Sequence, residues 1–433
     1  MTALLDEPRA RDAVWTDRFA QRTGRATSSV IREFLKLLDD PDIISFAGGL
    51  PAPEVFPADE ILAASHRVLR QQRDQALQYG ATEGYRPLRE LLVRHMARYG
   101  IEVGPENVLV TSGAQQALDL VGKAFINPGD RIAMEDPTYL GAIQAFSAYE
   151  AHYVTVPLDD DGMCVDRLED ALRAAPKFVY VLPNFQNPSG VTLSLARRRR
   201  LVEICARYGT PIVEDDPYGQ LRYEGDHLPP LVTLDADLHG CARGERSFRG
   251  SVIYLGTLSK TLAPGLRIGW VVASAEVVSK LAVLKQGADL HSSSFAQMVA
   301  YETAQGGFLD RHVKLIRQVY AERRDAMLSA LQRHMPAGVR WTHPQGGLFL
   351  YLTLPPGVLA ADVLKDALAA KVACIPGTAF HPVGGGERSM RLNFSYSRPE
   401  VIEEGIARLG AVLRRHVSPA RAPQAPPAAV SAG

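Results

Sequence analysis

Short runs that are apolar at nearly every position alternate with helix-like segments over most of the chain, and this alternation limits the possible folds most strongly. Examples of such runs are "NVLVTSG", "KFVYVLP", "TPIVEDD" and "SVIYLGT". Continuous β-branched runs between helices are typical of a largely parallel sheet buried on both faces. The sequence therefore predicts an α/β fold, with a large domain built on a mostly parallel sheet flanked by helices.

The pattern changes after about residue 305, where a smaller α+β domain is expected over residues 305–417. A long helical pattern, "FLDRHVKLIRQVYAERRDAMLSALQRHM", precedes strands around a Gly-Gly turn in "VRWTHPQGGLFLYLTL". Residues 16–60 are expected to pack with this domain, because a short early segment needs a host core, and residues 61–304 then form the large domain. Residues 1–15 are expected to be flexible, and the Pro/Ala-rich residues 418–433 to be disordered.

Composition excludes several classes of partner. The 433 residues contain 48 Lys+Arg and 48 Asp+Glu, so the formal net charge is zero, which argues against a nucleic-acid or membrane partner. No apolar run approaches the roughly 20 residues of a membrane span, and the N-terminus lacks the apolar core of a secretory signal. Four scattered cysteines without C-x-x-C spacing predict free thiols in a reducing cytoplasm.

Polar residues follow the predicted strands where each one ends, namely Ser112, Asn187, Asp215 and Lys260. In open α/β sheets the ligand crevice lies at the carboxyl ends of the strands. We therefore expect these four separate regions of sequence to meet in one pocket.

Each of these positions also has an ordinary structural interpretation. In "VTSGAQQALDL" a strand ends at Thr111 and a helix starts near Ala114, so the turn is either an anion site at a helix N-terminus or a plain strand–helix turn. Asn187 either binds a ligand oxygen or belongs to an Asn-Pro turn. Asp215 follows a buried strand, where metal ligation is a weak alternative because no suitably spaced histidine lies near, so no metal is expected.

Lys260 alone would be interpreted as a lysine that reaches solvent from a strand end. A carboxylate elsewhere in the pocket changes this interpretation. A lysine that binds an aldehyde covalently, opposite a carboxylate that keeps a ring nitrogen protonated, is what a pyridoxal 5'-phosphate (PLP) site needs. The Ser112–Gln115 turn and Arg267 are suited to the phosphate.

The motifs "SKTLAPGLRIGW", "NPSG", "DDPYG", "TSGAQQ" and "MRLNFS" together resemble the class I/II aminotransferases, which are PLP enzymes of fold type I. Their order and spacing fit over about residues 20–415. Two further stretches, "IISFAGGLPAPEVFP" and "LQYGATEGYRPLRE", resemble the subgroup of 2-aminoadipate and kynurenine aminotransferases.

The resemblance implies a role for each matching residue around PLP. Lys260 would form the Schiff base and shuttle the proton, Asp215 would pair with the ring nitrogen, and Tyr139 would stack on the ring as the third catalytic residue. The remaining cofactor-binding residues it implies are Gly113, Ala114, Gln115, Asn187, Tyr218, Thr257, Ser259, Arg267 and, toward the partner subunit of a homodimer, Tyr79.

For the substrate, the resemblance implies that Arg391 binds the α-carboxylate, aided by Gly49 and Asn187. Arg25, in "TGRATSSVIREFLK", would meet a distal carboxylate of the substrate, or else is a surface arginine before a helix N-cap. The implied reaction moves the amino group of a 2-aminoadipate-like, aromatic or branched amino acid to 2-oxoglutarate in ping-pong fashion. A β-lyase, a decarboxylase, an amino-acid oxidase and a PLP-domain ligand sensor remain alternatives.

Overall fold

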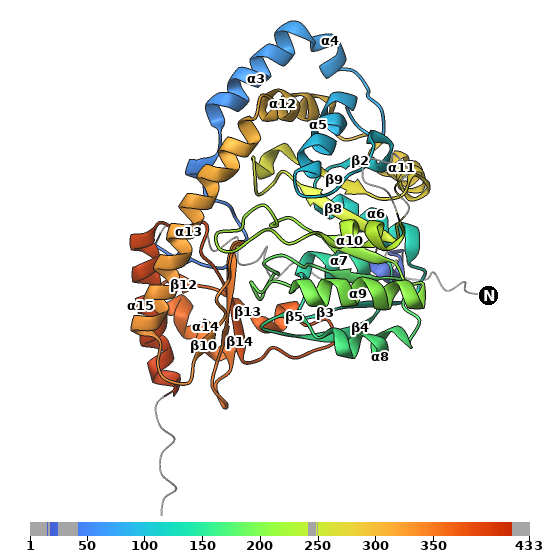
Figure 1. Ribbon diagram of the computed structural model, residues 1–433. Coiled ribbons are helices and arrows are strands. Elements are labelled where there is room, and N and C mark those ends of the chain that lie inside the picture. Colours follow the sequence, from blue (N-terminus) through green and yellow to red (C-terminus); the bar gives the residue numbers. More distant parts are fainter. Residues whose placement is uncertain (1–14, 16–17, 25–41, 241–247, 249, 418–433) are drawn as a thin grey trace, which may run out of the picture.

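A mixed sheet of eight strands forms the centre of the larger part of the molecule (Figure 1). The structure is a computed structural model that describes residues 15, 18–24, 42–240, 248 and 250–417. In spatial order the strands are β2 (Val108–Thr111), β9 (Gly269–Val272), β8 (Val252–Thr257), β7 (Ile212–Asp215), β6 (Val179–Val181), β3 (Arg131–Asp136), β4 (His152–Asp159) and β5 (Gly162–Met163).

The pairings from β8 through β7, β6 and β3 to β4 are all parallel. Strand β9 runs antiparallel between β2 and β8, and β5 is an antiparallel addition to β4 at the other edge. The predicted mostly parallel sheet is therefore confirmed. Its antiparallel strand β9 follows β8 directly in the chain and lies beside it.

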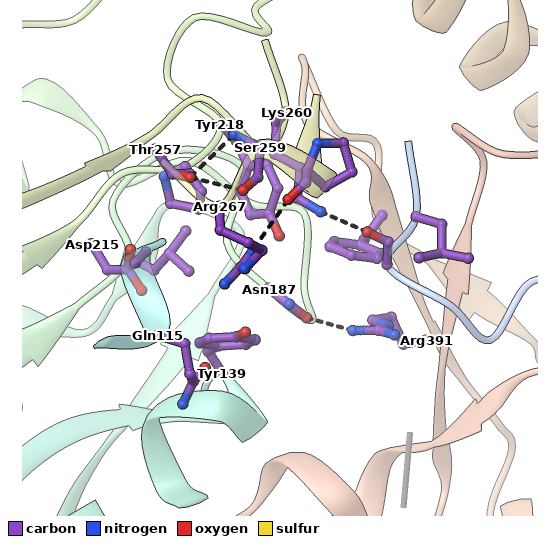
Figure 2. Close-up of a pocket in the computed structure, with 17 residues that line it drawn as sticks. Gln115, Tyr139, Asn187, Asp215, Tyr218, Thr257, Ser259, Lys260, Arg267 and Arg391 are labelled. Atoms are coloured by element: carbon purple, nitrogen blue, oxygen red, sulfur yellow. Dashed lines mark hydrogen bonds between the residues drawn. The ribbon is translucent and has the colours of Figure 1, made fainter. Parts of the chain in front are cut away.

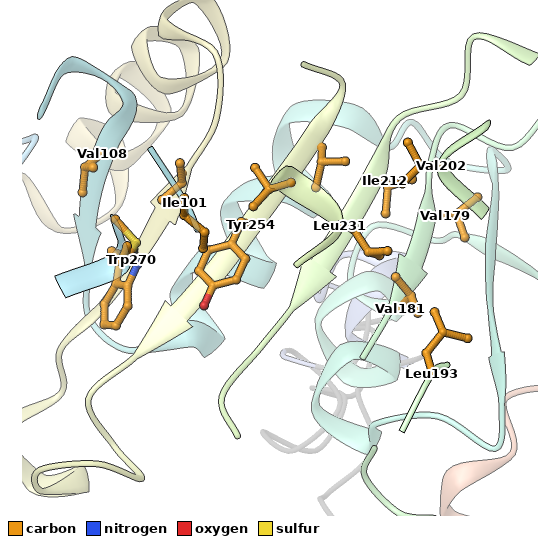
Figure 3. Close-up of a cluster of buried hydrophobic side chains, with 14 of the residues drawn as sticks. Ile101, Val108, Val179, Val181, Leu193, Val202, Ile212, Leu231, Tyr254 and Trp270 are labelled. Atoms are coloured by element: carbon orange, nitrogen blue, oxygen red, sulfur yellow. Dashed lines mark hydrogen bonds between the residues drawn. The ribbon is translucent and has the colours of Figure 1, made fainter. Parts of the chain in front are cut away.

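Both faces of this sheet are buried, because successive side chains of a strand point to opposite faces. In β6, Val179 and Val181 enter one hydrophobic cluster while Tyr180 enters another on the opposite face. Figure 3 shows the first cluster, in which these two valines lie near Ile212 and Leu231. Each fully buried valine or leucine contributes about 1.5–3 kcal/mol to stability, which explains why the central strands are rich in apolar residues.

Helices cover each face of the sheet. One face packs against α6 (Ala114–Phe125), α7 (Leu140–Ser147) and α11 (Ala275–Asp289). The other face packs against α5 (Arg86–Ala97), α8 (Leu168–Leu172), α9 (Leu195–Tyr208), α10 (Leu231–Leu238), α12 (Ser294–Ala304) and the start of α13 (Phe308–His334). Helices α3 (Ala58–Gln71) and α4 (Arg73–Ala76) pack on α12.

The C-terminal part has its own antiparallel sheet and hydrophobic cluster. Its strands, in spatial order, are β10 (Arg340–Trp341), β11 (Phe349–Thr353), β14 (Ser389–Asn393) and β13 (Ile375–Pro376), and its helices are α14 (Ala360–Ala369) and α15 (Pro399–Val417). Within the described ranges, short 3-10 helices lie at Gln21–Gly24, Pro53–Val55, Pro105–Asn107, Val165–Arg167, Pro264–Leu266 and Gly377–Phe380.

The early segment of the chain packs on this C-terminal part. Strand β1 (Ile44–Ser45) pairs in parallel with β12 (Val372–Ala373), and the buried side chain of Phe46 lies in the C-terminal cluster. We therefore propose the division of the chain at residues 60 and 304 that the sequence predicts. Residues 1–14 and 418–433, which were predicted to be flexible or disordered, lie outside the described residues.

Helix α13 joins the two parts (Figure 1). Near its start, Leu309 and Val313 lie in the cluster of the large sheet, whereas Met327 and Leu331 lie in the C-terminal cluster. At 1.5 Å per residue its 27 residues span roughly 40 Å. None of the helices in the described ranges is both long enough and apolar enough to cross a membrane.

Candidate active site

A cavity of about 550 Å³ lies beside the carboxyl ends of β6, β7 and β8 (Figure 2). It brings together most of the residues predicted from sequence. Those that line it are Gly49, Ala114, Gln115, Tyr139, Asn187, Asp215, Tyr218, Thr257, Ser259, Lys260, Arg267 and Arg391.

Lys260 lies three residues beyond the end of β8 and points into this cavity. Its Nζ donates a hydrogen bond to the backbone oxygen of Gly49 at 2.7 Å. Burial lowers the pKa of Lys260 to about 8, and the positive charges of Arg391 and Arg267 act in the same direction. A larger share of the amine is therefore neutral and nucleophilic near neutral pH than for an exposed lysine.

The depressed pKa of Lys260 leads to a prediction for the pH dependence of cofactor attachment. Only the neutral amine attacks an aldehyde, so the rate of covalent PLP attachment to the apoprotein should rise about tenfold per pH unit below the pKa. With a pKa of about 8, the rate should level off above that pH. Borohydride trapping of the adduct at successive times would measure the rate. A rate that keeps rising to pH 10.5 would contradict the prediction.

Asp215 ends β7 and is buried at the base of the cavity. Its Oδ2 accepts a hydrogen bond from the hydroxyl of Tyr180 at 2.8 Å, whereas its buried Oδ1 has no hydrogen-bond partner among the described residues. Burial raises the pKa of Asp215 to about 7. A buried carboxylate oxygen without a partner is costly, and a cationic ring nitrogen is a group that would satisfy it. This atom fits the PLP pyridine.

The turn between β2 and α6 forms another wall of the cavity. Gly113 adopts φ +80°, and a Cβ built on it would collide with the guanidinium of Arg267. That guanidinium donates from Nη2 to the Ser112 backbone oxygen at 3.2 Å. Ala114 and Gln115 begin α6, and the first amides of a helix have no acceptor within it. An arginine beside bare helix amides suits a phosphate, so this turn also fits PLP.

Close packing of backbone behind this turn allows a sharp test. A Cβ at Gly269, in β9, would lie 2.6 Å from the Gly113 carbonyl carbon and 2.7 Å from the Ala114 nitrogen. Gly269→Ala should therefore displace the start of α6 and weaken PLP binding to the apoprotein by about tenfold, as loss of one hydrogen bond to a charged group does. Gly265→Ala is the matched control, since nothing lies within 4 Å of its Cβ. Equal PLP dissociation constants for the two variants would refute this account.

Two hydroxyl groups lie beside the turn. Thr257 Oγ1 and Ser259 Oγ form a hydrogen bond at 2.9 Å, and the Ser259 backbone N–H donates to Thr257 Oγ1 at 3.1 Å. This pair fixes the chain between the end of β8 and Lys260. Both side chains line the cavity next to Arg267, where they add hydroxyl donors for a phosphate.

Arg391, in β14, is completely buried on the opposite side of the cavity. It donates from Nη1 to Asn187 Oδ1 at 2.9 Å and from Nη2 to the Ala47 oxygen at 2.6 Å, while Nε has no partner among the described residues. Its guanidinium carbon lies 4.2 Å from the ring centre of Phe349 and 4.9 Å from that of Phe380. Of its five N–H groups, three are left for a carboxylate.

Two tyrosines complete the cavity. Tyr139 precedes α7, and Figure 2 shows its ring beside Gln115. Burial raises the pKa of Tyr139 to about 12, with the Asp215 carboxylate acting in the same direction. Burial likewise raises the pKa of Tyr218. Both phenols therefore stay protonated at neutral pH, so they act as hydrogen-bond donors or as flat apolar surfaces.

The structure does not bring every predicted residue into the cavity. Gly113 lies behind its wall, in the turn. Tyr79 is 77% exposed and lies in a separate hollow, where its ring meets His291 edge-on at 5.9 Å. Arg25 lies outside the described residues, so its predicted role remains a prediction. Within the described ranges, no three His, Cys, Asp or Glu side chains gather where they could hold a metal ion.

Sequence reasoning missed two residues that shape the site. Phe349 lines the cavity and stacks on Arg391, and Tyr180 holds Asp215. A signal existed for Tyr180, because a hydroxyl in the middle of a buried apolar strand needs a partner. Phe349 had no such signal, since an aromatic residue in a strand is ordinarily a core residue.

Comparison with known proteins agrees with this geometry. The family model "Aminotransferase class I and II" matches residues 43–409. The chain belongs to this family. It is a PLP-dependent aminotransferase of fold type I, which confirms the resemblance noted in its motifs.

Among similar proteins, aromatic-amino-acid aminotransferase 1 of Thermococcus litoralis is 46% identical over 92% of this chain and 94% of its own length. The crystal structure of an α-aminoadipate aminotransferase from Thermus thermophilus, complexed with N-(5'-phosphopyridoxyl)-L-leucine, superposes with a TM-score of 0.85 at 43% identity, covering 93% of this aminotransferase and 98% of that chain. A kynurenine aminotransferase from Pyrococcus horikoshii superposes with a TM-score of 0.88 at 43% identity, covering 95% of this chain and 100% of that chain.

Proposed function

We propose that this aminotransferase transfers the amino group of a large α-amino acid to 2-oxoglutarate by a ping-pong mechanism. The donors we propose are 2-aminoadipate and aromatic or branched amino acids. The names of the similar proteins support this range, because they include an aromatic-amino-acid, an α-aminoadipate and a kynurenine aminotransferase. The observation that carries the proposal is that Lys260, Asp215 and Arg391 line one cavity.

The residues that line this cavity divide the reaction among them. When bound, PLP supplies an electron sink that makes the Cα–H bond of the donor acidic. Arg391 binds the α-carboxylate of the donor and fixes the direction of its Cα–H bond. Lys260, once its amine is released, would take the Cα proton as a general base and then, as a general acid, deliver it to the C4′ carbon of the cofactor. Asp215 stabilises positive charge at the ring nitrogen throughout.

The remaining parts of the proposal concern the partner subunit and the distal carboxylate. We propose a homodimer in which Tyr79 and the segment around His291–Ser294 reach the neighbouring site. The side chain of Tyr79 is 77% exposed, which permits this. A dimer with C2 symmetry is the commonest arrangement. Arg25 is proposed to bind the distal carboxylate of 2-aminoadipate and 2-oxoglutarate. A cytoplasmic location remains part of the proposal.

A panel of amino donors tests this function. With 2-oxoglutarate present, oxo-acid release from 2-aminoadipate and from aromatic donors should be accompanied by one glutamate per turnover. Without 2-oxoglutarate, release should stop after about one equivalent per site, because the donor nitrogen stays on the cofactor. Continued release without an acceptor would instead indicate elimination, decarboxylation or oxidation.

A further inference from the structure

A completely buried lysine, Lys285, lies in α11 behind the turn between β2 and α6. It does not line the cavity. A buried ammonium is stable only when it is paired and its hydrogens are bonded. The partners of Lys285 therefore indicate its role.

Lys285 forms an ion pair with Asp289, one helical turn further along α11. Its Nζ donates to both carboxylate oxygens of Asp289, at 2.6 and 2.7 Å. Burial acts to raise the pKa of Asp289, but hydrogen bonds from Lys285, Gln116 and Ser112 outweigh this and hold the pKa below its usual value. Asp289 is thus ionised at neutral pH, and Lys285 balances its charge.

The same lysine reaches the turn through Gln116. Lys285 Nζ donates to Gln116 Oε1 at 3.0 Å, and this oxygen also accepts the Ser112 backbone N–H at 2.7 Å. Gln116 Nε2 donates to Asp289 Oδ2 at 2.7 Å, and the Ser112 hydroxyl donates to the same oxygen at 3.1 Å. Gln116 is the third residue of α6, a position from which a side chain often caps the chain before the helix.

Both backbone polar groups of Ser112 are therefore fixed by hydrogen bonds to side chains. Gln116 fixes its N–H, and Arg267 fixes its carbonyl oxygen. After Gly113, residues Ala114 and Gln115 begin α6 and line the cavity. The direction of their backbone N–H groups depends on the position of Ser112, because only Gly113 separates them from it.

We propose that Lys285 and Asp289 are positioning residues for the cofactor phosphate, which fix Gln116 and through it the Ser112–Gln115 turn. This inference rests on the proposed assignment of that turn to the phosphate of PLP. The neutral pair also keeps the charge of Asp289 from repelling the phosphate, since the carboxylate lies within hydrogen-bond distance of Ser112.

The test compares two probes, PLP and pyridoxal, which differ only in the phosphate. Lys285→Met keeps the length of the side chain. It leaves the negative charge of Asp289 without a counter-ion and removes the hydrogen bond from Lys285 Nζ to Gln116 Oε1. The dissociation constant of PLP from the apoprotein should rise about 10- to 100-fold, as for other groups that orient a ligand's direct contacts. The dissociation constant of pyridoxal should stay within about twofold of wild type. Lys280→Met, on the exposed side of α11, is the matched control and should change neither value.

A second variant covers the case in which Lys285→Met does not fold. Gln116→Met leaves the Lys285–Asp289 ion pair in place but removes the acceptor of the Ser112 backbone N–H. It should give the same selective loss of PLP affinity. Unchanged PLP affinity in a folded variant would overturn the proposal. So would an equal loss of PLP and pyridoxal affinity, because that result indicates general loosening of the fold.

Arg267→Ala separates this proposal from the assignment on which it rests. If wild type prefers PLP to pyridoxal and Arg267→Ala loses that preference, the turn binds the phosphate. Retention of the preference in Lys285→Met would then refute only the role of the Lys285–Asp289 pair. If Arg267→Ala keeps the preference, the assignment of the turn fails and the role of the pair fails with it.

Discussion

Lys260→Ala is expected to lower kcat/KM for transamination by more than about 10⁴-fold, because one side chain serves both as the covalent anchor and as the proton carrier. Its amine, with a pKa of about 8, lies in the cavity that Asp215 and Arg391 also line. In the described structure no other lysine lines this cavity, so no second amine replaces it. The rate of oxo-acid release with 2-oxoglutarate present measures the loss.

A spectroscopic measurement complements the kinetics of the Lys260 variant. The purified protein should lack the cofactor absorbance that disappears on borohydride reduction in wild type, and mass spectrometry should find no reduced PLP adduct. Lys280→Ala serves as the control, since it removes an exposed lysine from the surface of α11. Turnover of Lys260→Ala at more than a few per cent of wild type would refute its assignment as the proton carrier.

Asp215→Asn is expected to reduce kcat by roughly 10²–10³-fold while leaving PLP attached, because it removes one preorganised charge without changing the shape of the site. The asparagine keeps an oxygen for the Tyr180 hydroxyl, which now lies 2.8 Å from Asp215 Oδ2. It cannot hold the ring nitrogen in its cationic form, so loss of the Cα proton should become slow. A deuterium label on the donor Cα should reveal this as a larger kinetic isotope effect.

The neighbouring carboxylate provides the control for Asp215. Asp216 does not line the cavity, and it accepts hydrogen bonds from Asn184 and Gly219 at 2.9 Å. Asp216→Asn therefore makes the same change of charge one residue away, and its kcat should fall by less than about tenfold. If the two variants lost activity equally, the special role of Asp215 would be excluded.

Much of the fold could be predicted because its information is local. Strands β6 and β8 are apolar at successive positions, and this pattern is typical of strands buried on both faces. The order of strands is different, since it depends on contacts between distant segments. The position of β9 between β2 and β8 comes from pairings such as Val110 with Trp270, and no short stretch of sequence encodes them.

The site was predictable to the extent that its residues end strands or belong to family motifs. Asp215 and Lys260 stand at the ends of apolar runs, where a charged group calls for an explanation. Lys285 has no such signal, because "KLAVLKQGAD" looks like an ordinary helix with two solvated lysines. Its burial results from the packing of α11 against α6, which only the three-dimensional structure reveals.

The course of α13 has a consequence for how the protein unfolds. Leu309 and Val313 belong to one hydrophobic cluster, and Met327 and Leu331 to the other. Because a single continuous helix supplies side chains to both, melting either cluster removes the packing that keeps this helix formed, and an isolated helix gains little stability from its own backbone. The two parts should therefore melt in one cooperative transition, and a chain break within α13 should abolish folding of both fragments rather than release two independent domains.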